Sequence, residues 1–140
     1  TRFGPAPPTD AELLRAFLID RPFVITGPPR WNALDLGSTA MFAATLVYNT
    51  RRTEELVLDG RRFLLRRVLF PDNPPREWFV LDLIQQRDIA GLSLEELEQR
   101  LTSTLQEGRW RRDELLAMAR AYGTKVTQAL VERCLGRTVS

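Results

Sequence analysis

The dipeptide Asp59-Gly60 is the feature that most restricts how this chain can fold. It separates two strand-like runs, residues 56–58 and 62–70, and Asp-Gly between such runs is the strongest short signal for a β-hairpin, because both residues accept a positive φ. The run Leu46-Val47-Tyr48-Asn49 predicts a buried strand ahead of the hairpin. The middle of the chain therefore predicts a small antiparallel sheet built around a hairpin.

Helical signals lie on both sides of this block. Thr9 with Glu12, and Ser93 with Glu96, each match a capping box, in which a hydroxyl residue and a glutamate three positions later satisfy one another's backbone N–H groups. Apolar residues at helical spacing follow both boxes. Residues 78–84 fit either a strand or the start of a helix. Further helices are predicted at residues 30–36, 111–122 and 124–136, the last ended by a glycine.

The order of these elements predicts the fold class. One N-terminal helix, a small antiparallel sheet with a β-hairpin and a C-terminal run of helices make an α+β pattern. The length of 140 residues suits one domain, which we expect over residues 9–140. Residues 1–8 contain three prolines and are interpreted as an extended, linker-like lead-in. Because the chain begins with threonine, we interpret it as a processed protein or a piece of a longer one.

The numbers of histidine, lysine and cysteine residues exclude several classes of catalytic and metal-binding site. The sequence has no histidine, which excludes Ser-His, Cys-His and His-metal sites. It has one lysine, Lys125, in a context that matches neither a Walker A loop nor a Schiff-base site. The single Cys134 cannot form an internal disulfide, which is typical of a reducing compartment. We therefore expect a cytoplasmic protein that is not an enzyme and holds no cofactor or metal. Asp82, a lone acid in an apolar run, is a weak catalytic candidate.

Positive charge is concentrated in the sheet block, where residues 30–76 carry eight arginines against five acidic residues. Neighbours on a strand point to opposite faces, so two adjacent strand arginines should diverge. The arginines are either solvated groups paired with Glu54, Glu55 and Asp59, or a surface that contacts a phosphate backbone or an acidic partner. Bidentate bonding by guanidinium favours contact. Six of these arginines form three pairs: Arg51 with Arg52, Arg61 with Arg62, and Arg66 with Arg67.

Aromatic and amide residues in this region have two interpretations each. Trp31, Trp78 and Phe79 are predicted as packing residues rather than base-stacking platforms. Asn49 is interpreted as a local hydrogen-bonding cap at the end of a strand, or as an amide that contacts phosphate or base beside arginine. The side chains that we expect to form the core beneath the arginines are Trp31, Leu34, Tyr48, Phe63 and Trp78.

Three segments together carry a family resemblance. They read Trp-Asn-Ala-Leu at residues 31–34, Tyr-Asn-Thr-Arg at 48–51 and Gly-Arg-Arg-Phe at 60–63. In this order the block resembles the effector half of AbiE-type (type IV) antitoxins. The resemblance covers residues 22–84 well and the C-terminal helices loosely. Position 35 carries Asp where the resemblance leads us to expect Gly.

The resemblance implies a bacterial, phage-defence regulator that represses its own promoter and opposes a nucleotidyltransferase-like toxin, with no stable complex required. It also implies an α+β domain preceded by a winged helix, for which the residues before 22 are too few. Combining this resemblance with the charge pattern, we predict that the contacts with the toxin, DNA or RNA are made by Arg51, Arg52, Arg61, Arg62, Arg66 and Arg67, together with Asn49.

Two alternatives from other functional classes remain open. A stand-alone nucleic-acid-binding module predicts that the six paired arginines share one face and that affinity falls steeply with salt. An enzyme that works without histidine needs a pocket that collects Asp82, Tyr48, Asn49 and at least one arginine. The sequence leaves the oligomeric state, the toxin and the operator open.

Overall fold

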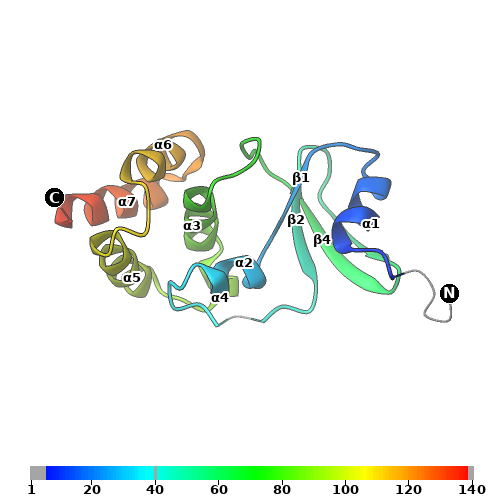
Figure 1. The fold of residues 1–140 in the computed structure, drawn as a ribbon, viewed down its shortest axis with the longest axis horizontal. Helices are drawn as coiled ribbons and strands as arrows, with labels where there is room; N and C mark the ends of the chain where they lie inside the picture. Colours follow the sequence, from blue (N-terminus) through cyan, green and yellow to red (C-terminus); the bar gives the residue numbers. More distant parts are fainter. Residues whose placement is uncertain (1–5, 40, 139–140) are drawn as a thin grey trace. The chain divides into compact units, whose positions relative to one another are not determined.

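The computed structural model describes residues 6–39 and 41–138, which form an α+β fold, as the sequence predicted (Figure 1). The described residues contain seven helices and four strands. In chain order these are α1 (Asp10–Phe17), β1 (Phe23–Thr26), α2 (Pro28–Ala33), β2 (Thr45–Asn49), β3 (Glu54–Leu58), β4 (Arg61–Arg67), α3 (Arg76–Gln85), α4 (Arg87–Ala90), α5 (Leu94–Gln106), α6 (Arg112–Tyr122) and α7 (Lys125–Arg137).

The chain divides into two compact units, and each is built from two separate stretches of chain. Unit 1 takes in the described residues of Thr1–Ile25 together with Ala43–Leu69, and unit 2 those of Thr26–Phe42 and Phe70–Ser140. Unit 1 holds α1 and nearly all of the sheet, and unit 2 holds α2 and α3–α7. The expected lead-in, residues 1–8, lies partly outside the described residues, and residues 6–9 form no helix or strand.

The sheet has the strand order β1-β2-β4-β3. The β3–β4 hairpin is antiparallel and turns at Asp59 and Gly60, whose φ angles are 51° and 75°, as the sequence predicted. The pairing of β2 with β4 is parallel, so a purely antiparallel sheet was a wrong prediction. The reason lies in the strand order: the hairpin turns β4 back into the direction of β2 and places it between β2 and β3.

The core of unit 1 lies between α1 and one face of the sheet (Figure 1). Leu14 and Leu18 from the helix pack with Val47, Phe63 and Leu65 from the strands. The capping box starts α1, because the Thr9 backbone N–H donates to Glu12 at 3.0 Å and the Glu12 N–H donates to the Thr9 hydroxyl at 3.1 Å. This helix therefore begins where the sequence predicted.

Unit 2 is organised around α3, which settles the ambiguity of residues 78–84 in favour of a helix. All side chains from Glu77 to Ile84 are buried. Helix α3 packs against α2, α6 and α7, and α7 also packs against α5 and α6. The second capping box, Ser93 with Glu96, starts α5 as predicted.

Several helix boundaries differ from the sequence prediction, and α2, which ends at Ala33 rather than at residue 36, differs most. Helix α2 begins at Pro28 rather than at residue 30, because proline is favoured in the first turn, where its missing N–H has no partner to lose. Helix α7 continues through Gly136 to Arg137. The five predicted core residues, Trp31, Leu34, Tyr48, Phe63 and Trp78, are all buried. Only Tyr48 and Phe63 lie in unit 1 with the paired arginines, so the prediction of a single core beneath those arginines was wrong for the other three, which lie in unit 2. Within residues 6–39 and 41–138, every helix is too short or too polar to cross a membrane.

Candidate functional site

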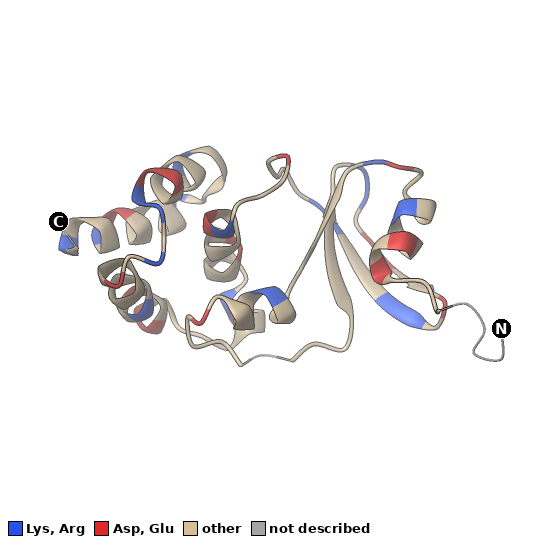
Figure 2. Cartoon of the chain, viewed as in Figure 1, with Lys and Arg blue, Asp and Glu red and all other residues tan. Residues whose placement is uncertain are grey.

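The six predicted contact arginines lie at two opposite ends of β4 (Figure 2). Arg61 and Arg62 begin the strand beside the hairpin turn, and Arg66 and Arg67 end it. The loop after β2 carries Arg51 and Arg52 to this second end. We call the group formed by Arg51, Arg52, Arg66 and Arg67 the arginine corner.

The pairing register sets the faces on which the strand arginines lie. Arg67 shares a face with Phe63 and Leu65, which pack against α1, and Arg66 lies on the opposite face. This is the divergence that the sequence predicted. Arg61 and Arg62 diverge in the same way at the other end. The six arginines therefore do not share one face, contrary to the expectation for a module that uses all of them together.

Asn49 joins the two chain segments of the arginine corner, as the last residue of β2. Its side-chain oxygen accepts hydrogen bonds from the backbone N–H groups of Arg51 and Arg52 at 2.8 and 2.9 Å. Its amide nitrogen donates to the carbonyls of Arg52 and Arg66 at 3.0 and 3.3 Å. Asn49 is only 1% exposed, so it acts here as a cap that fixes the corner, the first of its two sequence interpretations.

A second pair of bonds closes the same end of the sheet. The backbone N–H of Arg67 donates to the Thr53 hydroxyl at 3.0 Å, and that of Val68 donates to the Asn49 carbonyl at 3.0 Å. The sequence analysis did not identify Thr53. A threonine in a polar loop gives no local indication of which distant backbone group its hydroxyl will bind.

Three of the six arginines form ion pairs inside unit 1. Arg61 contacts Asp10 of α1 at 2.9 Å, and Arg62 contacts Glu55 across the hairpin. Arg52 contacts Glu54 at 3.1 Å, and its guanidinium lies 5.4 Å from the centre of the Phe17 ring. Glu54 and Glu55 were both expected partners, whereas Asp10 was not, because α1 is distant in sequence.

Arg51 and Arg67 differ from these three. Both are exposed, and neither guanidinium has an ion-pair partner within the part of the chain that the structure describes. The charges of Arg51 and Arg67 are therefore not balanced by an ion pair among the described residues. The corner therefore presents a local excess of positive charge next to backbone that is already fixed.

Asp82, the weak catalytic candidate, lies in α3 of unit 2 and is buried. Its Oδ2 accepts a hydrogen bond from the Trp31 indole at 3.0 Å and another from the Thr26 hydroxyl. The carboxylate thus links α3 to the end of β1 and to α2. It stands in a different unit from Tyr48 and Asn49, the other members of the expected pocket.

Position 35, where the resemblance leads us to expect Gly, has a backbone that suits glycine. Asp35 has a φ of 60° and follows the end of α2. Its carboxylate accepts a bond from Arg109 at 2.8 Å, and this contact, followed by the charge of Glu107, raises the pKa of Arg109. Asp is one of the few residues other than Gly that enter this conformation at low cost.

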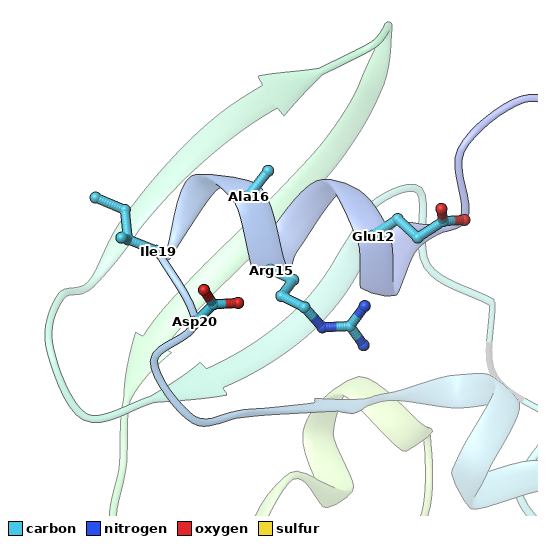
Figure 3. A pocket seen from close by; sticks show the side chains of 5 residues that line it. All are labelled: Glu12, Arg15, Ala16, Ile19 and Asp20. Carbon is cyan, nitrogen blue, oxygen red and sulfur yellow. The ribbon is translucent and has the colours of Figure 1, made fainter.

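A shallow hollow of about 430 Å³ lies along α1 and the turn that follows it (Figure 3). Its charged groups have both signs, and two of its residues have positive φ: Ile19 at 53° and Asp20 at 58°. Ile19 is 77% exposed. The hollow is lined by Glu12, Arg15, Ala16, Ile19 and Asp20, none of which the sequence had singled out as a contact residue.

The described residues contain no group of three or more histidine, cysteine or acidic side chains placed to hold a metal ion. Cys134 is buried in α7, and this burial raises the pKa of its thiol. No protein-family model, curated protein or solved structure matches this chain.

Proposed function

We propose that this chain is a non-catalytic effector domain of the antitoxin type, which opposes a nucleotidyltransferase-like toxin by binding. The observation that carries the proposal is the arginine corner held by Asn49. The Tyr-Asn-Thr-Arg segment of the resemblance, residues 48–51, ends β2 and leads into the loop of the arginine corner. The Gly-Arg-Arg-Phe segment, residues 60–63, leads into β4, and the far end of this strand carries Arg66 and Arg67. A rigid group of cations with unbalanced charge suits the recognition of an anionic partner.

The charge of unit 1 supports the same proposal. By sequence, unit 1 carries nine basic and six acidic residues, whereas unit 2 carries eleven basic and twelve acidic ones. Excess charge of one sign on one unit steers a partner of opposite sign toward it. We propose that the domain works in the cytoplasm as part of a regulator of transcription, and that unit 1 makes its contacts.

Toxin neutralisation in cells tests the proposal. An AbiE-type nucleotidyltransferase toxin is induced in bacteria alone and together with this chain, and viable cells are counted. We expect the chain to restore viability and the R51S/R67S variant to restore less. The R61S/R62S variant is the matched control, because it removes the same charge at the other end of β4. Failure of the unmodified chain to protect against the toxin would overturn the proposal.

A further inference from the structure

We infer that the arginine corner contacts the phosphate backbone of nucleic acid without reading its sequence. The inference rests on the proposed function and deepens it by naming the partner class. It starts from Arg51 and Arg67, which are exposed and have no ion-pair partner among the described residues. Arginine outside an ion pair keeps its five donors available, and these match phosphate oxygens in a bidentate arrangement.

The corner is fixed before any ligand arrives. Asn49 holds the backbone of Arg51 and Arg52 through two accepted bonds and ties it to β4 through two donated bonds. Thr53 holds the backbone of Arg67 in the same way. Because the loop is already ordered, binding does not have to pay for ordering it, and more of the contact energy appears as affinity.

The composition of the corner favours nucleic acid over an acidic protein. Residues 49–53 are Asn, Thr, Arg, Arg and Thr, with no apolar side chain among them. A protein interface needs an apolar core at its centre, whereas arginine beside hydroxyl residues is the usual set for phosphate and sugar contacts. Thr50 and Thr53 are exposed within the same loop.

The residues in and next to this loop also explain why the affinity should not depend on the base sequence of the nucleic acid. Tyr48, which precedes the loop, is 1% exposed, and Phe17 lies beneath the Arg52 guanidinium. The loop of residues 49–53 contains no aromatic side chain on which a base could stack. Contacts that reach only phosphates position a protein on a duplex and carry no sequence information.

Arg52 gives the inference a test by gain of binding. Its pair with Glu54 is exposed, with 43% and 38% of the two side chains accessible, and exposed pairs of this kind contribute little to stability. The E54Q variant removes the ion pair of Arg52 and with it a negative charge beside the corner. We expect E54Q to bind a polyanion more tightly than the unmodified chain, an effect that simple loss of folding cannot produce.

The experiment titrates the full chain into labelled nucleic acid at several salt concentrations. The probes are two short DNA duplexes of unrelated sequence and a tRNA, with polyglutamate as the carboxylate control. We expect both duplexes to bind alike, and R51S/R67S to lose at least about tenfold in affinity and to lower the salt slope by about 2, one for each phosphate contact removed. R61S/R62S, the matched control, should lose less than about threefold, because its arginines are paired with Asp10 and Glu55.

Each outcome decides for or against the inference. It is overturned if the unmodified chain binds none of the nucleic acids at low salt, if both double variants lose affinity equally, or if polyglutamate binds as tightly as the duplexes. Thermal unfolding of each variant checks that it is folded. Loss of nucleic-acid binding in R51S/R67S with toxin neutralisation intact would refute the link between the two while leaving the antitoxin proposal standing. Binding without neutralisation would refute the antitoxin proposal alone.

Discussion

Asn49 shows how one buried amide can define a surface that it does not itself reach. Its side-chain oxygen accepts two hydrogen bonds and its side-chain nitrogen donates two, all of them with backbone groups of arginines. An amide side chain supplies both the acceptor and the two donors that these bonds use, whereas a carboxylate of the same shape has no donors. The geometry of the arginine corner therefore depends on a residue that would be invisible to its partner.

The N49D variant tests this role. Aspartate keeps the bonds to the N–H groups of Arg51 and Arg52 but turns a negatively charged oxygen toward the carbonyls of Arg52 and Arg66. We expect the free energy of unfolding to fall by about 1–3 kcal/mol, measured by urea denaturation, because two carbonyls lose their donor. N73D, the same change in an exposed loop, is the control and should have an effect within about 0.5 kcal/mol. Equal effects of the two variants would contradict the structural role of Asn49.

At the scale of secondary-structure elements, short sequence motifs were sufficient to predict helix starts and the hairpin turn. Thr9 and Ser93 were identified as caps because their partners lie three residues away, and Asp59-Gly60 specified its own turn. Helix α3 was ambiguous for a physical reason: it is buried on every side, so its apolar residues show no helical periodicity. Its two buried acids, Glu77 and Asp82, added polar positions that are normally read as an outer face.

Asp82 connects three elements, and its removal should be felt in unit 2. In D82A, the Trp31 indole N–H and the Thr26 hydroxyl lose their acceptor inside a buried region. We expect a loss of about 2–4 kcal/mol in the free energy of unfolding, from the unsatisfied donors and the cavity. D82N keeps one acceptor oxygen and should recover at least half of this loss. If D82N is as unstable as D82A, the hydrogen bonds are not what holds these elements together.

The whole molecule could be predicted only in outline. The sequence indicated the α+β class but not the parallel pairing of β2 with β4, because such a pairing joins residues 18 positions apart and leaves no local pattern. The division into two units, each built from two separate stretches of chain, could not be predicted from the sequence either. For the site, the sequence supplied all six arginines but could not separate the corner from the hairpin end, since that distinction depends on Asn49 and on Asp10 of a distant helix.

Acid sensitivity is a property of the whole chain that follows from its two capping boxes. The pKa values of Glu12 and Glu96 are lowered below the ordinary 4.5, first by hydrogen bonds from the backbone of Thr9 and Ser93 and then by the hydroxyls of those residues. A carboxyl whose folded pKa is lowered contributes stability that is fully present above its unfolded pKa and is lost as the pH falls through the folded value.

We therefore expect the free energy of unfolding, measured by urea titration from pH 7 downward, to fall as the pH drops below about 4.5. The E12Q/E96Q variant keeps the capping geometry without the charge, so its fall over the same range should be smaller. E132Q, on an exposed position of α7, reports the effect of removing one charge away from a cap. A profile of E12Q/E96Q that coincides with that of the unmodified chain would refute this account.

The hairpin between β3 and β4 also bears on the order in which unit 1 assembles. Its strands are joined by two residues, so closing it requires little loop entropy, whereas β2 must find β4 across an intervening strand. The hairpin should thus belong to the folding nucleus, with β2 docking later.

In stopped-flow kinetics we expect the G60A variant to fold more slowly than the unmodified chain, because the φ of 75° at this position disfavours alanine by about 1 kcal/mol. N49D should instead mainly accelerate unfolding. The arginine corner needs both β2 and β4, so it would then form only after the hairpin, and its hydrogen bonds would report the docking of β2.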